Sequence, residues 1–381
     1  MLFKSKLIPL AGAVALAFAG TVGAQELVVK IGHVAPVSGE ISHLGKDNEN
    51  GAKLAIEELN AKGILIGGKK VKFELLAEDD AADPKQGTAV AQKLVDAKVN
   101  GVIGHLNSGT TVPASKIYDK AGIVQISPSA TLVEYTHQGF KGAFRVVAND
   151  GQLGGTLGRY AVEVKGAKKI AVIDDKTAYG EGVAKQFIIG AKSKGAVIVD
   201  QQHTTKTATD FNAILTSIRS KKPDLIFFGG FDSVGGPMLR QMKALGVNAN
   251  FMGGDGLCTT KLIELAADGL GDGKVVCAEA GGVLAAQKKV REDWDAAYKK
   301  KFGLDVQIYA PYVYDALMVM AEAMKQANSA EPAKYLPVLK KIQYKGITGD
   351  IAFDERGDIK DGALTIFTYK GGKKEVVQVV K

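Results

Sequence analysis

The chain has 381 residues, 46% of them hydrophobic, and a formal net charge of +8 at neutral pH. A chain of this length buries enough apolar surface for two domains of ordinary size. Its 46 glycines and only 10 prolines are typical of a turn-rich globular protein rather than a disordered one. Basic residues are interleaved with Asp and Glu along the whole chain, so no basic tract indicates nucleic-acid binding.

The first 24 residues have the pattern of a cleavable secretory signal. Lys4 and Lys6 precede an apolar run over residues 7–18, and small residues follow up to Ala24. A membrane-spanning helix needs about 18 or more apolar residues, so this run is too short to be an anchor. We expect cleavage after Ala24 and, because no cysteine for lipid attachment lies nearby, export as a free protein.

Two cysteines, Cys258 and Cys277, occur in this chain, which the leader directs to an oxidising compartment. A single disulfide between them is the default expectation. Two free buried thiols are the alternative that the residues alone leave open.

The first half of the chain alternates short β-rich runs with helical patterns, which predicts a parallel sheet with helices on both faces. In the predicted helix over 46–60, apolar residues recur at i, i+3, i+4 and i+7 from Ala52 to Leu59. The expected strands are 27–33, 71–76, 102–103 and 124–127, and the expected helices are 46–60, 84–97 and one that begins within GHLNSGTTVPAS at 104–115.

The second half repeats this organisation. The strand and turn IGHLNSGTT, followed later by QISPSAT, have a counterpart in FFGGFDSVGG, followed later by FMGGDGLCT. This similarity favours two α/β lobes over one long sheet. The expected strands are 170–174, 197–200, 225–228, 251–252, 351–353 and 365–369, and the expected helices are 151–164, 182–194, 211–220, 237–245, 287–302 and 309–327.

Polar residues follow several of these strands. Ligands of open α/β sheets bind outside the carboxyl ends of strands, and the first N–H groups of a helix suit an anion. Ser108, Thr110 and Thr131 supply hydroxyls at such ends, and Asp255 supplies a carboxylate between glycines. Helix capping for the hydroxyls and a plain turn for the aspartate are the simpler alternatives.

The sequence carries no visible catalytic machinery. It has no dinucleotide fingerprint, phosphate loop, nucleophile elbow, H-E-x-x-H or C-x-x-C motif. Its five histidines show no metal-ligand spacing. We therefore expect neither an enzyme nor a bound cofactor or metal.

Six motifs in order carry a resemblance to a known family: GHLNSGTTVPAS, QISPSAT, AEDDAADPKQG, DDKTAYGEG, GGDGL and DERGD. Over essentially the whole mature chain the sequence resembles the bacterial periplasmic branched-chain amino-acid-binding proteins of the Leu/Ile/Val-binding type. The resemblance implies the type I periplasmic binding protein fold, an α/β fold of two doubly wound parallel-sheet lobes joined by a three-segment hinge. It also implies a monomer in the periplasm that captures a branched-chain or other aliphatic amino acid and delivers it to an inner-membrane ABC permease.

On this reading the chain divides into a signal peptide and two discontinuous lobes. Lobe 1 is expected at 25–148 and 279–354, and lobe 2 at 149–278 and 355–381. The hinge crossings are expected near 147–150, 277–280 and 352–358.

The resemblance also assigns site residues, position by position. Ser108, with its backbone N–H, and Thr131 would bind the α-carboxylate of the ligand. The Ser129 carbonyl, Thr131 Oγ and the Asp255 carboxylate would hold its α-ammonium group. The cleft and the side-chain pocket would be lined by Leu44, Tyr179, Phe231 and Tyr309.

The chain departs from the family at some of these positions. The family commonly has glutamate at Asp255, an aromatic residue at Leu44 and a tyrosine at Phe231, and its best-known disulfide would fall at Ala82 and Asn107. These differences concern the exact ligand more than its class. A related small ligand, such as an amide, an aromatic acid or another amino acid, is one alternative. A secreted two-lobe enzyme is the other, and it would need a titratable pair or a nucleophile–base couple facing the cleft.

Overall fold

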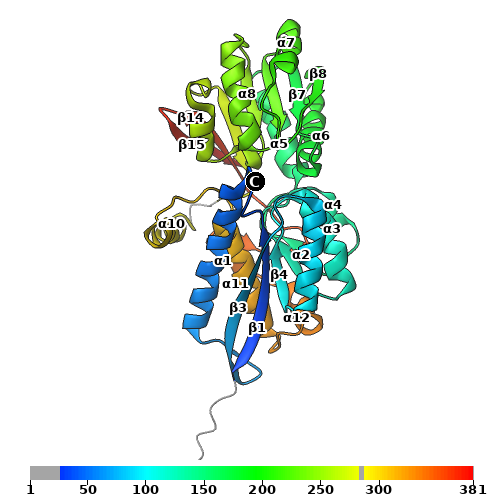
Figure 1. Ribbon diagram of the computed structural model, residues 1–381, viewed down its shortest axis with the longest axis vertical. Coiled ribbons are helices and arrows are strands. Elements are labelled where there is room, and N and C mark those ends of the chain that lie inside the picture. The colour runs from blue at the N-terminus through cyan, green and yellow to red at the C-terminus, as the bar shows by residue number, and fades with distance from the viewer. Residues whose placement is uncertain (1–25, 283–286, 381) are drawn as a thin grey trace, which may run out of the picture.

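The computed structural model describes residues 26–282 and 287–380, which form two α/β lobes, one above the other in Figure 1. The expected signal segment, residues 1–24, lies outside the described residues. Within the described ranges, no helix is long and apolar enough to cross a membrane.

Lobe 1 is built on a six-stranded sheet in the order β2-β3-β1-β4-β5-β6, parallel throughout except for the β2–β3 hairpin. Side chains of β1 alternate between two apolar clusters, Ile31 facing one and Val34 the other. Helices α1 and α11 pack together over the first, and α2 and α3 over the second (Figure 1). Both faces of the parallel sheet are therefore covered, as such sheets require.

The elements of lobe 1 have the following bounds: β1 Leu27–Ala35, α1 Ser42–Lys62, β2 Leu65–Ile66, β3 Lys69–Asp79, α2 Pro84–Asp96, β4 Gly101–Gly104, α3 Ser108–Lys120, β5 Gln125–Ser127, α4 Glu134–His137, β6 Ala143–Arg145, α10 Lys288–Phe302, α11 Ala310–Gln326, α12 Pro332–Leu339, and the small hairpin of β12 Tyr344–Lys345 with β13 Asp350–Ile351.

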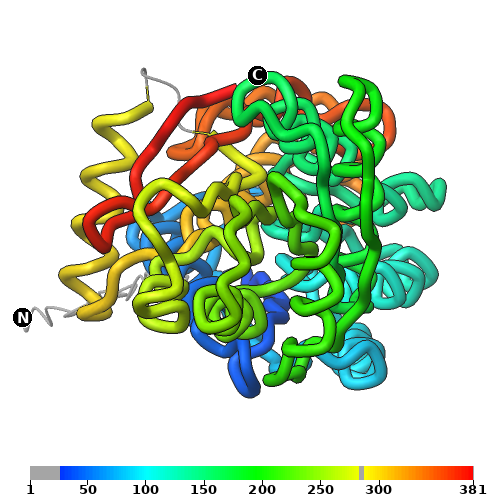
Figure 2. Tube along the Cα trace, turned by 90° about the horizontal axis from the view of Figure 1, so that it is seen from above, coloured from blue at the N-terminus to red at the C-terminus, as the bar shows by residue number. Residues whose placement is uncertain are grey.

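Lobe 2 is built on a seven-stranded sheet in the order β15-β14-β11-β10-β9-β7-β8. The strands from β8 to β11 are parallel, whereas β14 and β15 are antiparallel. Figure 2 shows these two C-terminal strands in red at one side of the molecule. Its elements are α5 Asp150–Glu163, β7 Lys169–Asp174, α6 Ala178–Ser193, β8 Val197–His203, α7 Asn212–Lys221, β9 Leu225–Gly229, α8 Asp232–Ala244, β10 Asn250–Gly253, the 3-10 turns Asp255–Leu257 and Ala267–Gly269, α9 Lys261–Ala266, β11 Val275–Glu279, β14 Leu364–Lys370 and β15 Lys373–Val380.

The chain passes between the lobes three times: between β6 and α5, after β11, and between β13 and β14. Backbone hydrogen bonds join the three connections. Ala148 N donates to Ala280 O at 2.8 Å, and Arg145 N donates to Gly357 O at 2.9 Å. This arrangement is the type I periplasmic binding protein fold that the motifs predict.

The elements differ from the expected ones in a few places. Helix α8 begins at Asp232, five residues before the expected start. Its first two turns contain Gly235, Gly236 and Pro237, which are unfavourable in helices, so the sequence did not indicate this start. Strand β15 and helix α12 were not expected, and the sheet of lobe 2 has an antiparallel edge. Cys258 and Cys277 form the expected disulfide, which links the turn after β10 to β11.

Candidate ligand-binding site

A cavity of about 690 Å³ lies between the two lobes. Lobe 1 contributes the start of α1 with Ile41, and lobe 2 contributes the first turns of α6 and α8 with Tyr179 and Phe231. Small-molecule sites commonly have volumes of about 300–1,000 Å³. The cavity therefore suits a small ligand held by both lobes.

Direct contacts bridge the lobes around this cavity. His43 Nε2 lies 2.8 Å from Asp232 Oδ2, and Lys206 Nζ donates to Ala82 O at 2.8 Å. These contacts join residues that are 189 and 124 positions apart in the chain. The lobes thus bring together the strand ends that the sequence places far from one another.

Asp255 is a predicted ligand-binding residue, and it lies buried behind Tyr179 rather than in the lining of this cavity. It follows β10, is 0% exposed, and accepts hydrogen bonds from Tyr179 Oη at 2.7 Å and Tyr309 Oη at 2.9 Å. Burial raises the pKa of its carboxyl to about 6, although the two hydroxyls act in the opposite direction. Both donors are neutral, so neither compensates the negative charge of the ionised carboxylate, which suits a cationic ligand group.

The glycines around Asp255 allow this arrangement. A Cβ at Gly254 would lie 2.6 Å from Tyr179 Oη, and one at Gly256 would lie 2.9 Å from the Tyr179 ring. Only glycine lets the tyrosine reach the carboxylate without a steric clash. Gly256 N also donates to Tyr179 Oη at 2.9 Å, which fixes the hydroxyl.

Tyr309 reaches Asp255 from lobe 1, and a second buried carboxylate holds it there. Asp47, on α1, accepts hydrogen bonds from four consecutive backbone N–H groups, those of residues 307–310, at 2.9–3.2 Å. Tyr298 Oη donates to the same carboxylate at 3.1 Å. Because the first N–H groups of a helix lack partners, Asp47 caps the start of α11 and positions Tyr309 just before it.

The start of α3 and the loop after β5 carry the residues predicted to bind the other end of the ligand. Ser108 is the first residue of α3 and is buried; its Oγ accepts from Leu132 N at 3.2 Å. The N-cap residue, Asn107, makes no side-chain cap hydrogen bond. Within the described part of the chain, Thr131 Oγ1 is buried without a hydrogen-bond partner. Free donors at a helix N-terminus suit a carboxylate.

Asp150 is a candidate site residue that the sequence did not reveal. It is 0% exposed, its N–H donates to Thr131 O at 2.7 Å, and neither carboxylate oxygen has a hydrogen-bond partner among the described residues. Burial, with the nearby negative charge of Asp255, raises the pKa of the Asp150 carboxyl to about 7, although the adjacent Thr131 hydroxyl acts in the opposite direction. The capping role at the start of α5 belongs to Asn149, whose side chain accepts from Gln152 N at 3.3 Å.

The remaining predicted residues are placed as follows. The rings of Tyr179 and Phe231 lie 5.0 Å apart, and both line the cavity. Ser129 Oγ donates to Leu106 O at 3.0 Å, which holds the loop before α3. Leu44 is fully buried in the main apolar cluster, and the cavity reaches its neighbour Ile41 instead. Among the residues that the structure describes, no group of side chains suits a metal ion.

Comparisons with known proteins show the family and the fold. A family model described as periplasmic binding protein matches residues 28–374. An amino acid binding protein of Pseudomonas aeruginosa is 36% identical over 347 residues, which is 90% of each chain. The leucine-specific-binding protein of Salmonella typhimurium is 35% identical over 369 residues, or 96% of each chain.

A solved structure shows the same fold. The branched-chain amino acid transporter substrate binding protein of Streptococcus pneumoniae, in complex with isoleucine, matches with a TM-score of 0.82 and 27% identity, covering 93% of this chain and 99% of that one. The chain therefore belongs to the periplasmic binding protein family and is similar within it to the Leu/Ile/Val-binding proteins.

Proposed function

We propose that this protein binds a branched-chain or other aliphatic α-amino acid between its lobes and delivers it, in the periplasm, to an ABC permease of the inner membrane. One observation carries the proposal. A buried carboxylate, Asp255, is held by two neutral tyrosine hydroxyls, beside a second buried carboxylate, Asp150, without hydrogen-bond partners in the described chain. Such a group needs a cation, and the α-ammonium of an amino acid supplies one.

The other end of the proposed site would bind the second charged group of the zwitterionic ligand, its α-carboxylate. The α-carboxylate would meet the start of α3, where Ser108 and Thr131 offer hydroxyls and the helix dipole is positive. Tyr179 and Phe231 would then contact the side chain, since both line the cavity. Each apolar side chain that such walls bury contributes about 1.5–3 kcal/mol.

Binding would hold the lobes closed. Ser108 and Thr131 belong to lobe 1 and Asp255 to lobe 2, so only the closed arrangement engages both charged ends of the ligand. The crossings near 147–150, 277–280 and 352–358 are the hinge in this proposal. The basic leader of the sequence and the transporter relatives support the periplasmic setting and the permease partner.

A thermal-shift panel tests the function. Leucine, isoleucine and valine should each raise the melting temperature saturably, since a ligand at about 100 times its Kd adds roughly 2.7 kcal/mol of stability. Mass spectrometry of the same samples should recover the amino acid unchanged. If no amino acid stabilised the protein, or if a product accumulated, the proposed function would be wrong.

A further inference from the structure

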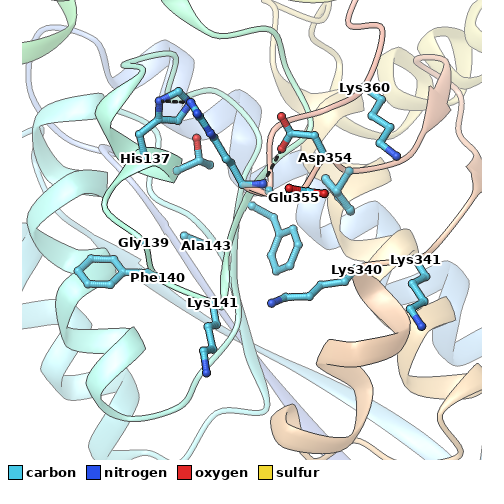
Figure 3. Close-up of a pocket in the computed structure, with 15 residues that line it drawn as sticks. His137, Gly139, Phe140, Lys141, Ala143, Lys340, Lys341, Asp354, Glu355 and Lys360 are labelled. Carbon is cyan, nitrogen blue, oxygen red and sulfur yellow. Dashed lines mark hydrogen bonds between the residues drawn. The ribbon is translucent and has the colours of Figure 1, made fainter.

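A larger cavity, of about 810 Å³, lies on lobe 1 away from the interlobe site. Three segments that are distant in sequence line it, and each carries cationic side chains. Figure 3 shows Lys141 in the turn before β6, Lys340 and Lys341 directly after α12, and Lys360 in the last turn before β14. The Lys340 side chain extends from α12 toward the segment that carries Lys141.

The lining of this cavity, which we call the basic cavity, has excess positive charge. Four lysines and Arg356 face two acidic residues, Asp354 and Glu355, which leaves a net charge of +3. Asp354 Oδ1 already accepts hydrogen bonds from the N–H groups of Arg356 and Asp358, each at 2.9 Å, and so it stabilises the turn in which it lies. None of the four lysines forms an ion pair within the described ranges, whereas lysines such as Lys93 and Lys374 do.

The wall that bears Arg356 is rigidly held. Asp358 accepts from the buried Arg145 Nε at 2.5 Å and from Thr136 Oγ1 at 2.7 Å, and this ion pair keeps the pKa of the Asp358 carboxyl low against the effect of burial. Gly357, at φ +95°, lies so close to Ala143 O that a Cβ there would approach within 2.1 Å. The turn is therefore fixed against β6, and the cavity exists before any ligand arrives, which lowers the entropy lost on binding.

The floor of the basic cavity is apolar. Phe144 and Phe353 meet edge to face with ring centroids 4.9 Å apart, and both are buried beneath it. Phe140, half-buried, forms part of the rim. A ligand with a carbon body and several anionic groups matches this lining better than a simple inorganic ion, because it meets the floor and the surrounding ammonium groups at once.

We propose that the basic cavity binds a small organic or condensed anion with two or more carboxylate or phosphoryl groups. The ammonium groups lie on three separate segments, so a monovalent anion engages only part of the set. Lysines bind such oxyanions as point charges and adapt to either chemistry. The site is separate from the amino-acid site, since the two cavities share no lining residue.

Calorimetric titration of the full mature chain tests the proposal, with citrate as the polycarboxylate, pyrophosphate as the phosphoryl anion and acetate as the monovalent control, all at one ionic strength. Citrate or pyrophosphate should bind saturably with one site per chain, and acetate should not. The tighter of the two identifies the preferred anionic group. Saturable binding by neither would overturn the proposal.

Two charge-matched variants locate the site. Lys141→Gln/Lys340→Gln/Lys360→Gln removes one cation from each segment and should weaken the anion at least about tenfold, while leucine binding stays within about twofold of the parent. Lys185→Gln/Lys192→Gln/Lys221→Gln removes the same charge from exposed positions of lobe 2 and should leave the anion within about twofold. Equal weakening by both triple variants would show a general charge effect and overturn the assigned site. If the Lys141→Gln/Lys340→Gln/Lys360→Gln variant lost leucine binding to the same extent, the basic cavity would not be independent of the amino-acid site.

Discussion

Asp47 and Asp255 are two buried carboxylates, one in each lobe, joined through a single residue. Tyr309 donates its backbone N–H to Asp47 at 2.9 Å and its hydroxyl to Asp255 at 2.9 Å. Asp47 accepts four backbone N–H groups and a tyrosine hydroxyl, whereas Asp255 accepts two hydroxyls and lies near a second, unpaired carboxylate. We propose that the two carboxylates have different roles: Asp47 serves the fold, whereas the charge of Asp255, which meets only neutral hydroxyls, serves a ligand.

The contrast also explains why neither lobe alone supplies every hydrogen bond to the two carboxylates. Asp47 stabilises lobe 1 by capping α11, and through Tyr309 it sets the donor that Asp255 meets across the cleft. Buried polar groups that are fully paired contribute to stability, whereas those left unpaired destabilise the free protein.

The largest effect on stability is expected at Asp47. Asp47→Ala removes the acceptor from four backbone N–H groups, and it should lower the free energy of unfolding by about 3 kcal/mol. Chemical denaturation with urea measures this directly. Glu375→Ala, at an exposed glutamate, is the control and should change the unfolding free energy by less than about 0.5 kcal/mol. An unchanged midpoint for Asp47→Ala would contradict the capping role.

Asp255→Ala should show the reverse pattern. Leucine affinity should fall at least about a hundredfold, or roughly 2.7 kcal/mol, because the α-ammonium loses its counter-charge. The ligand-free variant should be as stable as the parent or more so, since a buried carboxylate with a raised pKa opposes folding. Calorimetry and urea denaturation of one preparation supply both numbers. A folded variant that bound leucine like the parent would remove Asp255 from the site.

The pH dependence separates binding from folding. The ammonium group pairs with ionised Asp255, whose pKa is raised to about 6, so affinity should fall as pH drops below 6, by about tenfold per unit for one proton. Stability of the ligand-free protein should change in the other direction. Raised pKa values at Asp150 and Asp255 contribute stability at low pH that is lost as pH rises through about 6 to 7. Affinity that stayed constant from pH 7 to 4.5 would contradict this assignment.

The smallest effect is expected at the side-chain wall. Phe231→Ala should lower the preference for leucine over alanine by about fivefold, near 1 kcal/mol, because the ring lines the cavity and, in the proposed site, meets the ligand's side chain rather than a charged end. The Tyr179 ring lies 5.0 Å from Phe231, so the substitution can also lower both affinities through Tyr179. The ratio of the leucine and alanine affinities cancels that common loss. A preserved ratio would place the side-chain pocket elsewhere.

The sequence predicted the fold well where local pattern and tertiary position agree. Helix α1 and the strands of both sheets follow hydrophobic periodicity, and Ser108, Thr131 and Asp255 stand at strand ends where ligands bind. Strand β15 escaped prediction because its side chains are mostly exposed at a sheet edge, so it has no apolar alternation.

The rest of the site depends on contacts that no local pattern contains. Asp47 sits within the polar run Lys46–Asn50 and looks solvent-exposed, but its partners lie about 260 residues away. Asp150 directly precedes the expected helix over 151–164, and only its burial beside Thr131 marks it as a candidate site residue. Leu44 was assigned by position in the family, and the structure places it inside the core, one turn from the residue that lines the cavity.

The central claim is that the site recognises both charged ends of a free amino acid, and one calorimetric comparison tests it. The parent protein is titrated with leucine, with leucinamide, which lacks the carboxylate, and with 4-methylpentanoate, which lacks the ammonium group. All three share the same side chain, so the walls contribute equally. We predict that leucine binds and that each analogue binds at least about a hundredfold more weakly, because a buried charge without its partner costs about 3–5 kcal/mol. If either analogue bound as tightly as leucine, the account of the site would be wrong.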